Sequence, residues 1–222
     1  MGELITYQSN GGTCNGYIAG DRGPGIVVIQ EWWGLNDHIE DVVDRFAEAG
    51  FVAIAPDLYH GQSASEPDGA GKLMMALNLA EAAKDMSGAI NVLQKRTGRT
   101  KVGVVGFCMG GGLALVTACQ RPDAVAAVAP FYGLIPWASA QPEWSALTAK
   151  VEGHYAANDA FFTPDNAAAL QAQLRDLGKD ATLHVYPDTD HAFFNDTRPE
   201  VYDAAASAMA WNRIIALFRT TL

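Results

Sequence analysis

The sequence lacks several features by which protein classes are recognised. Its three cysteines form no Cys-x-x-Cys pair, and its five histidines show no His-Glu-x-x-His or comparable ligand spacing, so we expect no metal site. Positive charge is scarce, because 15 lysines and arginines stand against 25 acidic residues and give a formal net charge of −10. A chain without a basic stripe is poorly suited to nucleic acid. We therefore expect a small-molecule ligand and no nucleic-acid partner.

The sequence also shows no sign of a boundary between two domains. The 222 residues contain no Pro/Gly/Ser-rich linker, no internal repeat and no low-complexity run, so we expect residues 1–222 to form a single domain. The uncharged stretch 102–120 contains five glycines, which argues against a membrane helix. The odd number of cysteines and the absence of a leader-like start favour reduced thiols in the cytoplasm.

Apolar runs of strand length alternate with segments of helical periodicity. Residues 4–18 are predicted to form a hairpin that turns at Asn10-Gly11-Gly12. A helix is predicted to have Asp37 as its cap and Gly50 at its end. The alternation predicts an α/β fold in which a mostly parallel sheet carries helices on both faces. Further strands are predicted at 25–29, 51–55, 101–105, 124–129, 149–155 and 182–186, further helices within 74–94 and at 110–118, 165–177 and 201–218, and a long loop at 56–71.

The most informative motif is Gly-Phe-Cys-Met-Gly at residues 106–110, between a predicted strand and a predicted helix. A strand that runs straight into a helix needs a sharp turn, and glycines two residues either side of Cys108 remove the Cβ atoms that would clash there. The turn presents Cys108 over the sheet and aims backbone N–H groups of the helix start at it, which stabilises a developing anion. This is the geometry of a nucleophile elbow, with a thiol in place of the commoner serine.

Other interpretations of this turn fit the residues less well. A dinucleotide-binding turn requires glycine at position 108, and a P-loop requires Lys-Ser/Thr where Gly112 and Leu113 stand. No serine occupies a Gly-x-Ser-x-Gly turn. A thiol redox function is disfavoured because Cys119 lies roughly 16 Å along the helix from Cys108. Taken alone, Cys108 is also compatible with a buried structural cysteine.

Two further residues give Cys108 catalytic partners. Asp159 and His191 each follow a different predicted strand, and the carboxyl ends of parallel strands meet at one edge of a sheet. The chain order of nucleophile, acid and histidine is that of α/β-hydrolases. In such a triad the imidazole takes and returns the thiol proton, while the carboxylate orients the ring and balances its charge. Asp188 and Asp190 are rivals for the acid, but they lie on the histidine's own loop, which favours Asp159.

Five short segments are shared with a known family: QEWWGLN at 30–36, APDLYHG at 55–61, GVVGFCMGG at 103–111, Asn158-Asp159 and DHAF at 190–193. With them the sequence resembles the dienelactone hydrolases, or carboxymethylenebutenolidases, of the α/β-hydrolase superfamily over nearly its whole length. The resemblance implies the α/β-hydrolase fold. It also implies hydrolysis of a lactone or ester bond by a Cys-His-Asp triad, without a cofactor, through an acyl-thiol intermediate.

The resemblance implies roles for residues beside the triad as well. Glu31 matches a family glutamate that holds the resting thiol protonated, then moves when substrate binds and helps to generate the thiolate. The backbone N–H groups of Trp32 and Met109 match those of the family's oxyanion hole. A thiol that stays neutral until substrate arrives also resists oxidation, because oxidative damage follows thiolate character.

The residues expected to bind the substrate differ from those of the dienelactone-cleaving members of the family. Those enzymes hold the substrate carboxylate with two arginines. One of them lies four residues beyond the catalytic histidine, and Asn195 occupies that position here. The segment expected to hold the other, residues 68–72, contains no arginine. Lys72 and Arg198 are the candidates to supply part of that charge, although an ammonium does not reproduce bidentate carboxylate pairing.

The predicted substrate pocket is largely apolar, and Tyr59 and Phe193 are candidates to line it. We thus expect a hydrolase of a small ester or lactone. One alternative is a broad carboxylesterase or thioesterase that acts on uncharged esters. A non-catalytic binding protein of the same fold is a second alternative, disfavoured because such proteins lose triad members. No membrane partner is expected, and the protein is expected to be a monomer or a weak homo-oligomer.

Overall fold

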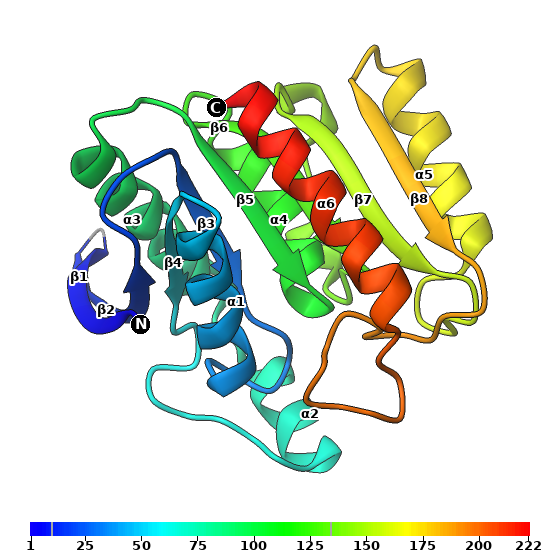
Figure 1. Cartoon of the computed structure of the whole chain (residues 1–222), viewed down its shortest axis with the longest axis horizontal. Helices are drawn as coiled ribbons and strands as arrows, with labels where there is room; N and C mark the ends of the chain where they lie inside the picture. The colour runs from blue at the N-terminus through cyan, green and yellow to red at the C-terminus, as the bar shows by residue number, and fades with distance from the viewer. Residues whose placement is uncertain (10, 134) are drawn as a thin grey trace.

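A computed structural model describes residues 1–9, 11–133 and 135–222, which form an eight-stranded sheet (Figure 1). The strands are β1 (Glu3–Ser9), β2 (Gly12–Ala19), β3 (Gly25–Ile29), β4 (Val52–Pro56), β5 (Val102–Phe107), β6 (Val125–Phe131), β7 (Lys150–Ala156) and β8 (Ala181–Tyr186). Their order in the sheet is β1-β2-β4-β3-β5-β6-β7-β8. β1 pairs antiparallel with β2, and β2 with β4, whereas the remaining neighbours are parallel.

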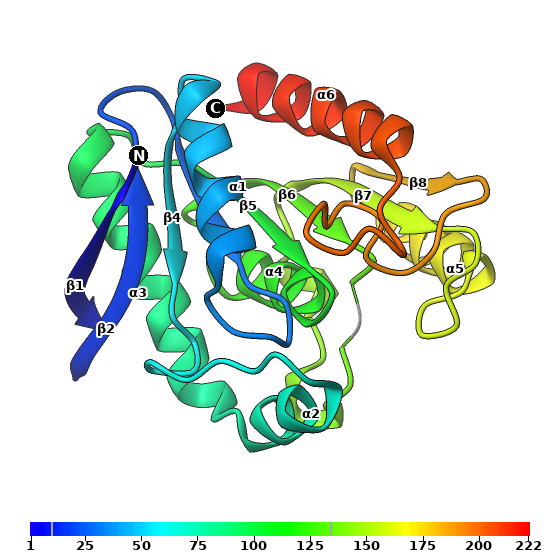
Figure 2. The same ribbon diagram turned by 60° about the horizontal axis from the view of Figure 1, so that its bottom comes forward.

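Helices cover both faces of the sheet. α1 and α6 lie on one face, and α3, α4 and α5 lie on the other (Figures 1 and 2). Each face has its own apolar core, in which Phe46 and Ile214 represent the first face and Met86 and Leu113 the second. The helices are α1 (Asp37–Glu48), α2 (Pro67–Ala76), α3 (Leu79–Thr97), α4 (Met109–Gln120), α5 (Pro164–Asp176) and α6 (Ala204–Thr221), with short 3-10 turns η1 (Ala138–Ala140) and η2 (Trp144–Ala146).

The burial of the strands explains their sequences. β3, β4 and β5 are buried along their whole lengths, which is why they appear as continuous apolar runs. The edge hairpin of β1 and β2 instead alternates exposed and buried residues, because one of its faces meets water. The predicted fold class, an α/β fold with a mostly parallel sheet, is therefore confirmed. No helix in the described ranges is long and apolar enough to cross a membrane.

The predicted helix boundaries are corrected at two places. Asp37 is the first residue of α1 and not its cap, because the side chain of Asn36 accepts the N–H of Ile39 at 3.2 Å. The predicted loop 56–71 ends early, since α2 begins at Pro67. Proline suits the first turn of a helix, where its missing N–H would have no partner.

Three further predictions differ from the structure or fall outside it. β6 continues through Phe131, beyond its predicted end at residue 129. α6 begins at Ala204 and not at Val201, because the side chain of Asp203 caps the first turn. Asn10, in the predicted hairpin turn, lies outside the described residues.

The parallel strands place their carboxyl ends at one edge of the sheet. In Figure 1 the arrowheads of these strands point toward α2 and toward the orange loop between β8 and α6. In an open α/β sheet, ligands bind just outside the carboxyl ends of the strands. The loops that follow β3, β5, β7 and β8 carry the predicted catalytic residues and are therefore gathered at this edge.

Candidate active site

Cys108 lies at the turn between β5 and α4. Its backbone angles, φ 54° and ψ −120°, are rare for an L-residue, and its N–H donates to the carbonyl oxygen of Phe131 at 3.0 Å. Glycine is required on both sides of it. A Cβ on Gly106 would collide with the carbonyl of Gly110, and a Cβ on Gly110 would collide with the carbonyl of Ile29. The motif therefore forms a strained strand-turn-helix with a half-buried cysteine at its apex.

His191 and Asp159 come from different loops and form a direct pair. Nδ1 of His191 lies 2.7 Å from Oδ2 of Asp159. The other carboxylate oxygen accepts the backbone N–H groups of Phe161 at 2.8 Å and Phe162 at 3.1 Å. Burial alone would raise the pKa of Asp159, but the hydrogen bonds from His191 and from these two N–H groups lower it further than burial raises it. The carboxylate is thus held ionised and in one orientation.

The imidazole of His191 interacts with both Asp159 and Cys108. Burial lowers the pKa of His191, but its hydrogen bond with Asp159 and its interaction with Cys108 raise that pKa to about 10. Because Asp159 occupies Nδ1, Nε2 is the ring nitrogen left for the thiol. The charges of Asp159 and of an ionised Cys108 both contribute to this rise, so these surroundings stabilise a positive charge on the ring when Cys108 is a thiolate.

Glu31 is buried just after β3, and its partner is Asn195. The Nδ2 group of Asn195 donates to Oε2 of Glu31 at 2.8 Å. The orientation of this amide is fixed, because its oxygen accepts both the backbone N–H of Thr197 at 3.1 Å and the Thr197 hydroxyl at 2.6 Å. Asn195, on the same loop as His191, also lines a hollow with Asn36 and Thr197, so a substrate contact by this residue stays a prediction.

Tyr132 is a neighbour of the site that the sequence analysis above does not single out. It follows β6 with a positive φ of 37°, and its ring centroid lies 5.0 Å from that of His191. Its hydroxyl is buried and finds no hydrogen-bond partner among the described residues. Burial, followed by the charges of Glu31 and Cys108, raises the pKa of Tyr132 well above its usual value, so the phenol stays neutral.

A cavity of about 420 Å³ opens over Cys108 and His191. Arg198 lines it, and among the described residues around it this is the one permanent cation. Its walls are otherwise largely apolar, and the remaining lining residues are Trp32, Trp33, Pro67, Met74, Asn158, Ala160, Phe161, Asp190 and Val201. No group of three or more His, Cys, Asp or Glu side chains in the described part of the chain is placed to hold a metal ion.

Three of the predicted substrate contacts do not line this cavity. Tyr59 is buried, and its hydroxyl lies 3.4 Å from the sulfur of Met109. Phe193 is fully buried and packs on Tyr132 in the core. Lys72 is exposed on α2. Sequence patterns place Tyr59 and Phe193 on the correct loops but miss the helix that contains Lys72, and they do not give the direction of each side chain.

The predicted oxyanion donors belong to two segments that meet beside Cys108. Met109 is the first residue of α4, so its N–H precedes the hydrogen-bonded turns of that helix. The start of α4 packs against the end of β3, since the residue after Met109, Gly110, leaves no space for a Cβ beside the carbonyl of Gln30. Trp32 follows two residues later and lines the cavity.

A model of the dienelactone hydrolase family matches residues 14–222 of this sequence. The chain belongs to this family. Its relatives include "Protein usf" of Aquifex pyrophilus, 37% identical, and a "Putative carboxymethylenebutenolidase" of Aquifex aeolicus, 35% identical, each with 100% of both chains covered. The predicted resemblance to dienelactone hydrolases is thereby confirmed.

The fold of the family is also found in solved structures. The crystal structure of a "Putative Dienelactone Hydrolase" from Klebsiella pneumoniae matches with a TM-score of 0.89 and 26% identity, and the match covers 99% of this chain and 98% of that chain. An esterase from Pyrobaculum calidifontis, at 18% identity and a TM-score of 0.74, shares the fold alone. This dienelactone hydrolase family member therefore has the α/β-hydrolase fold.

Proposed function

We propose that this protein hydrolyses a small ester or lactone, with Cys108 as nucleophile, His191 as base and acid, and Asp159 as the residue that orients the histidine. The observation that carries the proposal is the hydrogen bond of 2.7 Å between His191 and Asp159, formed beside the cavity that also contains Cys108. A thiol needs a base to form its thiolate, and an imidazole backed by a carboxylate supplies one.

The reaction has two halves. Cys108 loses its proton to Nε2 of His191, and its sulfur attacks the carbonyl carbon to form a tetrahedral oxyanion. The carbon–oxygen bond of the ester then breaks, the leaving alkoxide takes the proton from His191, and the acyl group remains on sulfur as a thioester. Water, deprotonated by His191, attacks the thioester, and the thiolate leaves and regains the proton. In a lactone the leaving alkoxide stays attached to the acyl group.

The residues around the triad support this course. The N–H groups of Trp32 and Met109 are proposed to receive the oxyanion, because one precedes the turns of α4 and the other borders the cavity. Glu31 is proposed to control the protonation of Cys108, as the family resemblance implies. The hydrogen bond that the neutral amide of Asn195 donates to its carboxylate supports such a controlled position.

A second candidate is the hydrolysis of uncharged esters or thioesters. It is favoured by the apolar walls of the cavity and by the pairing of its one guanidinium, because Nε and Nη2 of Arg198 already contact Oε1 of Glu200 at 2.9 and 2.8 Å. A substrate carboxylate would compete with Glu200 for this arginine.

The test compares cis-dienelactone with an uncharged aryl ester of similar size, with Cys108→Ala as the blank. Preference for the lactone would identify Arg198 as the carboxylate anchor and support the dienelactone activity. Turnover of the neutral ester alone would support the second candidate. Hydrolysis of neither, or hydrolysis that Cys108→Ala retains, would contradict the proposal.

The cellular setting is proposed on a separate observation. Cys14, Cys108 and Cys119 are all free thiols. Unpaired cysteines are typical of a reducing compartment, so we infer that the protein works in the cytoplasm.

A further inference from the structure

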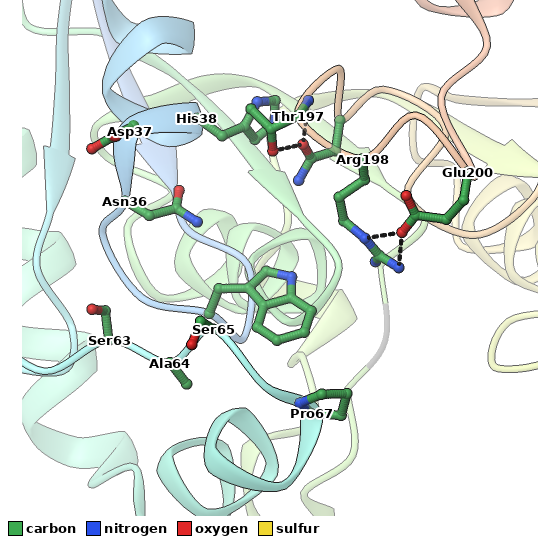
Figure 3. A pocket seen from close by; sticks show the side chains of 12 residues that line it. Asn36, Asp37, His38, Ser63, Ala64, Ser65, Pro67, Thr197, Arg198 and Glu200 are labelled. Atoms are coloured by element: carbon green, nitrogen blue, oxygen red, sulfur yellow. Dashed lines mark hydrogen bonds and ion pairs between the residues drawn. The ribbon is translucent and has the colours of Figure 1, made fainter.

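A second hollow adjoins the Cys108 cavity and is not used by the proposed mechanism. Its volume is about 700 Å³, and it shares Trp33, Pro67 and Arg198 with the cavity that holds Cys108. In Figure 3 the side chains of the loop before α2 lie on one side of it, and those of residues 197–200 lie across from them. A ligand attached to a carbonyl group at Cys108 can therefore extend into this hollow without leaving the protein surface.

The two rims of the hollow are held in place by hydrogen bonds. On one rim the N–H of Ala64 donates to the carbonyl oxygen of Trp33 at 2.9 Å. On the other, Asn195 accepts the N–H of Arg198 at 3.1 Å through its backbone and the N–H of Thr197 at 3.1 Å through its side chain. A hollow that is shaped before its ligand arrives loses little entropy when it binds.

The lining offers hydrogen-bond donors and acceptors around an aromatic ring. Ser63 and Ser65 are exposed and carry hydroxyl groups that both donate and accept. The side-chain oxygen of Asn36 is occupied by the N–H of Ile39, which leaves its amide NH₂ for a ligand. The indole of Trp33 supplies a flat apolar surface beside these groups. This combination suits a ligand in which hydroxyl groups alternate with C–H groups.

The charges of the hollow disfavour an anion. Asp37 and Glu200 both line it, against the single guanidinium of Arg198. Arg198 is already paired with Glu200 and lies 5.8 Å from the ring centre of Trp33. Burial lowers the pKa of His38, which also lines the hollow, so this ring adds no positive charge at neutral pH.

We infer that this hollow binds the alcohol portion of the substrate and that this portion is neutral and rich in hydroxyl groups, as in a sugar or another polyol. The inference rests on the proposed function and names its substrate class. The acyl portion then occupies the cavity walled by Trp32, Met74 and Phe161, where apolar groups are buried. Hydrolysis adds one water to the ester, leaves the acid beside Cys108 and releases the polyol from the exposed hollow.

The test uses four butyrate esters that differ only in the alcohol. Glucose 6-butyrate is compared with cyclohexylmethyl butyrate, which has a ring of similar size without hydroxyl groups. Glycolate butyrate and choline butyrate supply an anionic and a cationic alcohol. We expect kcat/KM for the glucose ester to exceed that for each of the others by about tenfold or more, as one or two hydrogen bonds would give. A ratio near one, or a higher kcat/KM for a charged ester, would overturn the inference.

Two matched variants locate the effect. Asn36→Asp keeps an N-cap acceptor for α1 but replaces the free NH₂ group with a carboxylate oxygen, so it should lower the glucose-to-cyclohexylmethyl ratio about fivefold to tenfold. Asn78→Asp makes the same chemical change at the N-cap of α3, whose residue lines a different hollow, and should leave the ratio unchanged. Equal ratios in the wild type and Asn36→Asp would overturn the assignment of this hollow.

A binding measurement separates this inference from the proposed function. Saturation-transfer NMR is used to observe methyl glucoside on Cys108→Ala, which cannot turn over by the proposed route. If no ester is hydrolysed but methyl glucoside binds, and the added Asn36→Asp change weakens that binding, the hollow is supported and the proposed function fails. If the esters are hydrolysed equally and methyl glucoside does not bind, the function is supported and the hollow fails.

Discussion

Two clusters in this protein combine a nucleophile, a histidine and an aspartate, but in different orders. At the carboxyl ends of the strands the histidine is the middle member, because it is hydrogen-bonded to Asp159 and lines one cavity with Cys108, which also raises its pKa. Beside β1 the aspartate is the middle member. Ser9 Oγ donates to one oxygen of the buried Asp85, and Nε2 of the half-exposed His60 lies 3.2 Å from the other.

The difference shows that the order of contacts, and not the residue types, makes a catalytic arrangement. An imidazole in the middle can take a proton from the nucleophile and return it to a leaving group near neutral pH. A carboxylate in the middle cannot, because carboxyl groups ordinarily titrate well below neutrality. Both clusters line hollows, but the first lies at the start of α4, where helix N–H groups can stabilise an anion, whereas the second joins β1 to α3. We therefore expect catalysis from the first cluster and structural support from the second.

Removing the two nucleophiles should give the largest contrast. Cys108→Ala should lower kcat/KM for the aryl ester about 10³-fold or more, because no other group can form the acyl intermediate. Ser9→Ala should leave kcat/KM of the folded protein unchanged, since it removes only a hydrogen bond to Asp85. Initial rates, with the folded fraction of each variant measured by circular dichroism, check both. Comparable losses of kcat/KM in the two variants would contradict the assignment of catalysis to the first cluster alone.

Neutralising the two aspartates should separate catalysis from stability. Asp159→Asn should lower kcat about 10²- to 10⁴-fold, because the ring of His191 loses the group that fixes its tautomer and stabilises its charge. Asp85→Asn should retain turnover but lower the free energy of unfolding by about 1–3 kcal/mol, as expected when a buried acceptor loses its partners. Steady-state kinetics and urea unfolding of both variants test this prediction. An Asp85→Asn variant that is inactive but as stable as the wild type would contradict a purely structural role for Asp85.

The charge on His191 should give the smallest effect, seen as pH-dependent stability. Because its pKa is raised from 6.5 to about 10 in the folded protein, its contribution to stability is full below pH 6.5 and is lost as pH rises through 10. The difference in unfolding free energy between wild type and His191→Gln should thus shrink between pH 7 and pH 10. Asp159 and Cys108 both raise this pKa, so the same comparison should vary less with pH in an Asp159→Asn background, and an equally steep dependence there would contradict the contribution of Asp159.

The sequence predicted the first cluster because each member is marked by local signals. Cys108 lies between glycines that a tight turn requires, and Asp159 and His191 lie three and five residues after the ends of β7 and β8. The carboxyl ends of parallel strands meet at one edge, so residues far apart in sequence are brought together by topology alone. Their pairing therefore needed no information about side-chain packing.

The residues around the triad could not be placed in the same way. Asn195 and Phe193 lie within four residues of His191, yet the first bonds to Glu31 and the second enters the core. Which way each side chain points is set by the irregular turns after β8, including the positive φ of 69° at Ala192, and no periodicity predicts such turns. For the same reason the amide of Asn195 as the partner of Glu31 is visible only in the structure.

The most direct test of the central claim is mass spectrometry of the protein during turnover of an aryl ester. Samples quenched in acid at successive times after mixing are digested and the peptides are weighed. We predict one acyl group on the peptide that contains Cys108 in the wild type, and no acyl group on any peptide of Cys108→Ala. An acyl group on a different residue, or the same adduct in Cys108→Ala, would contradict the account.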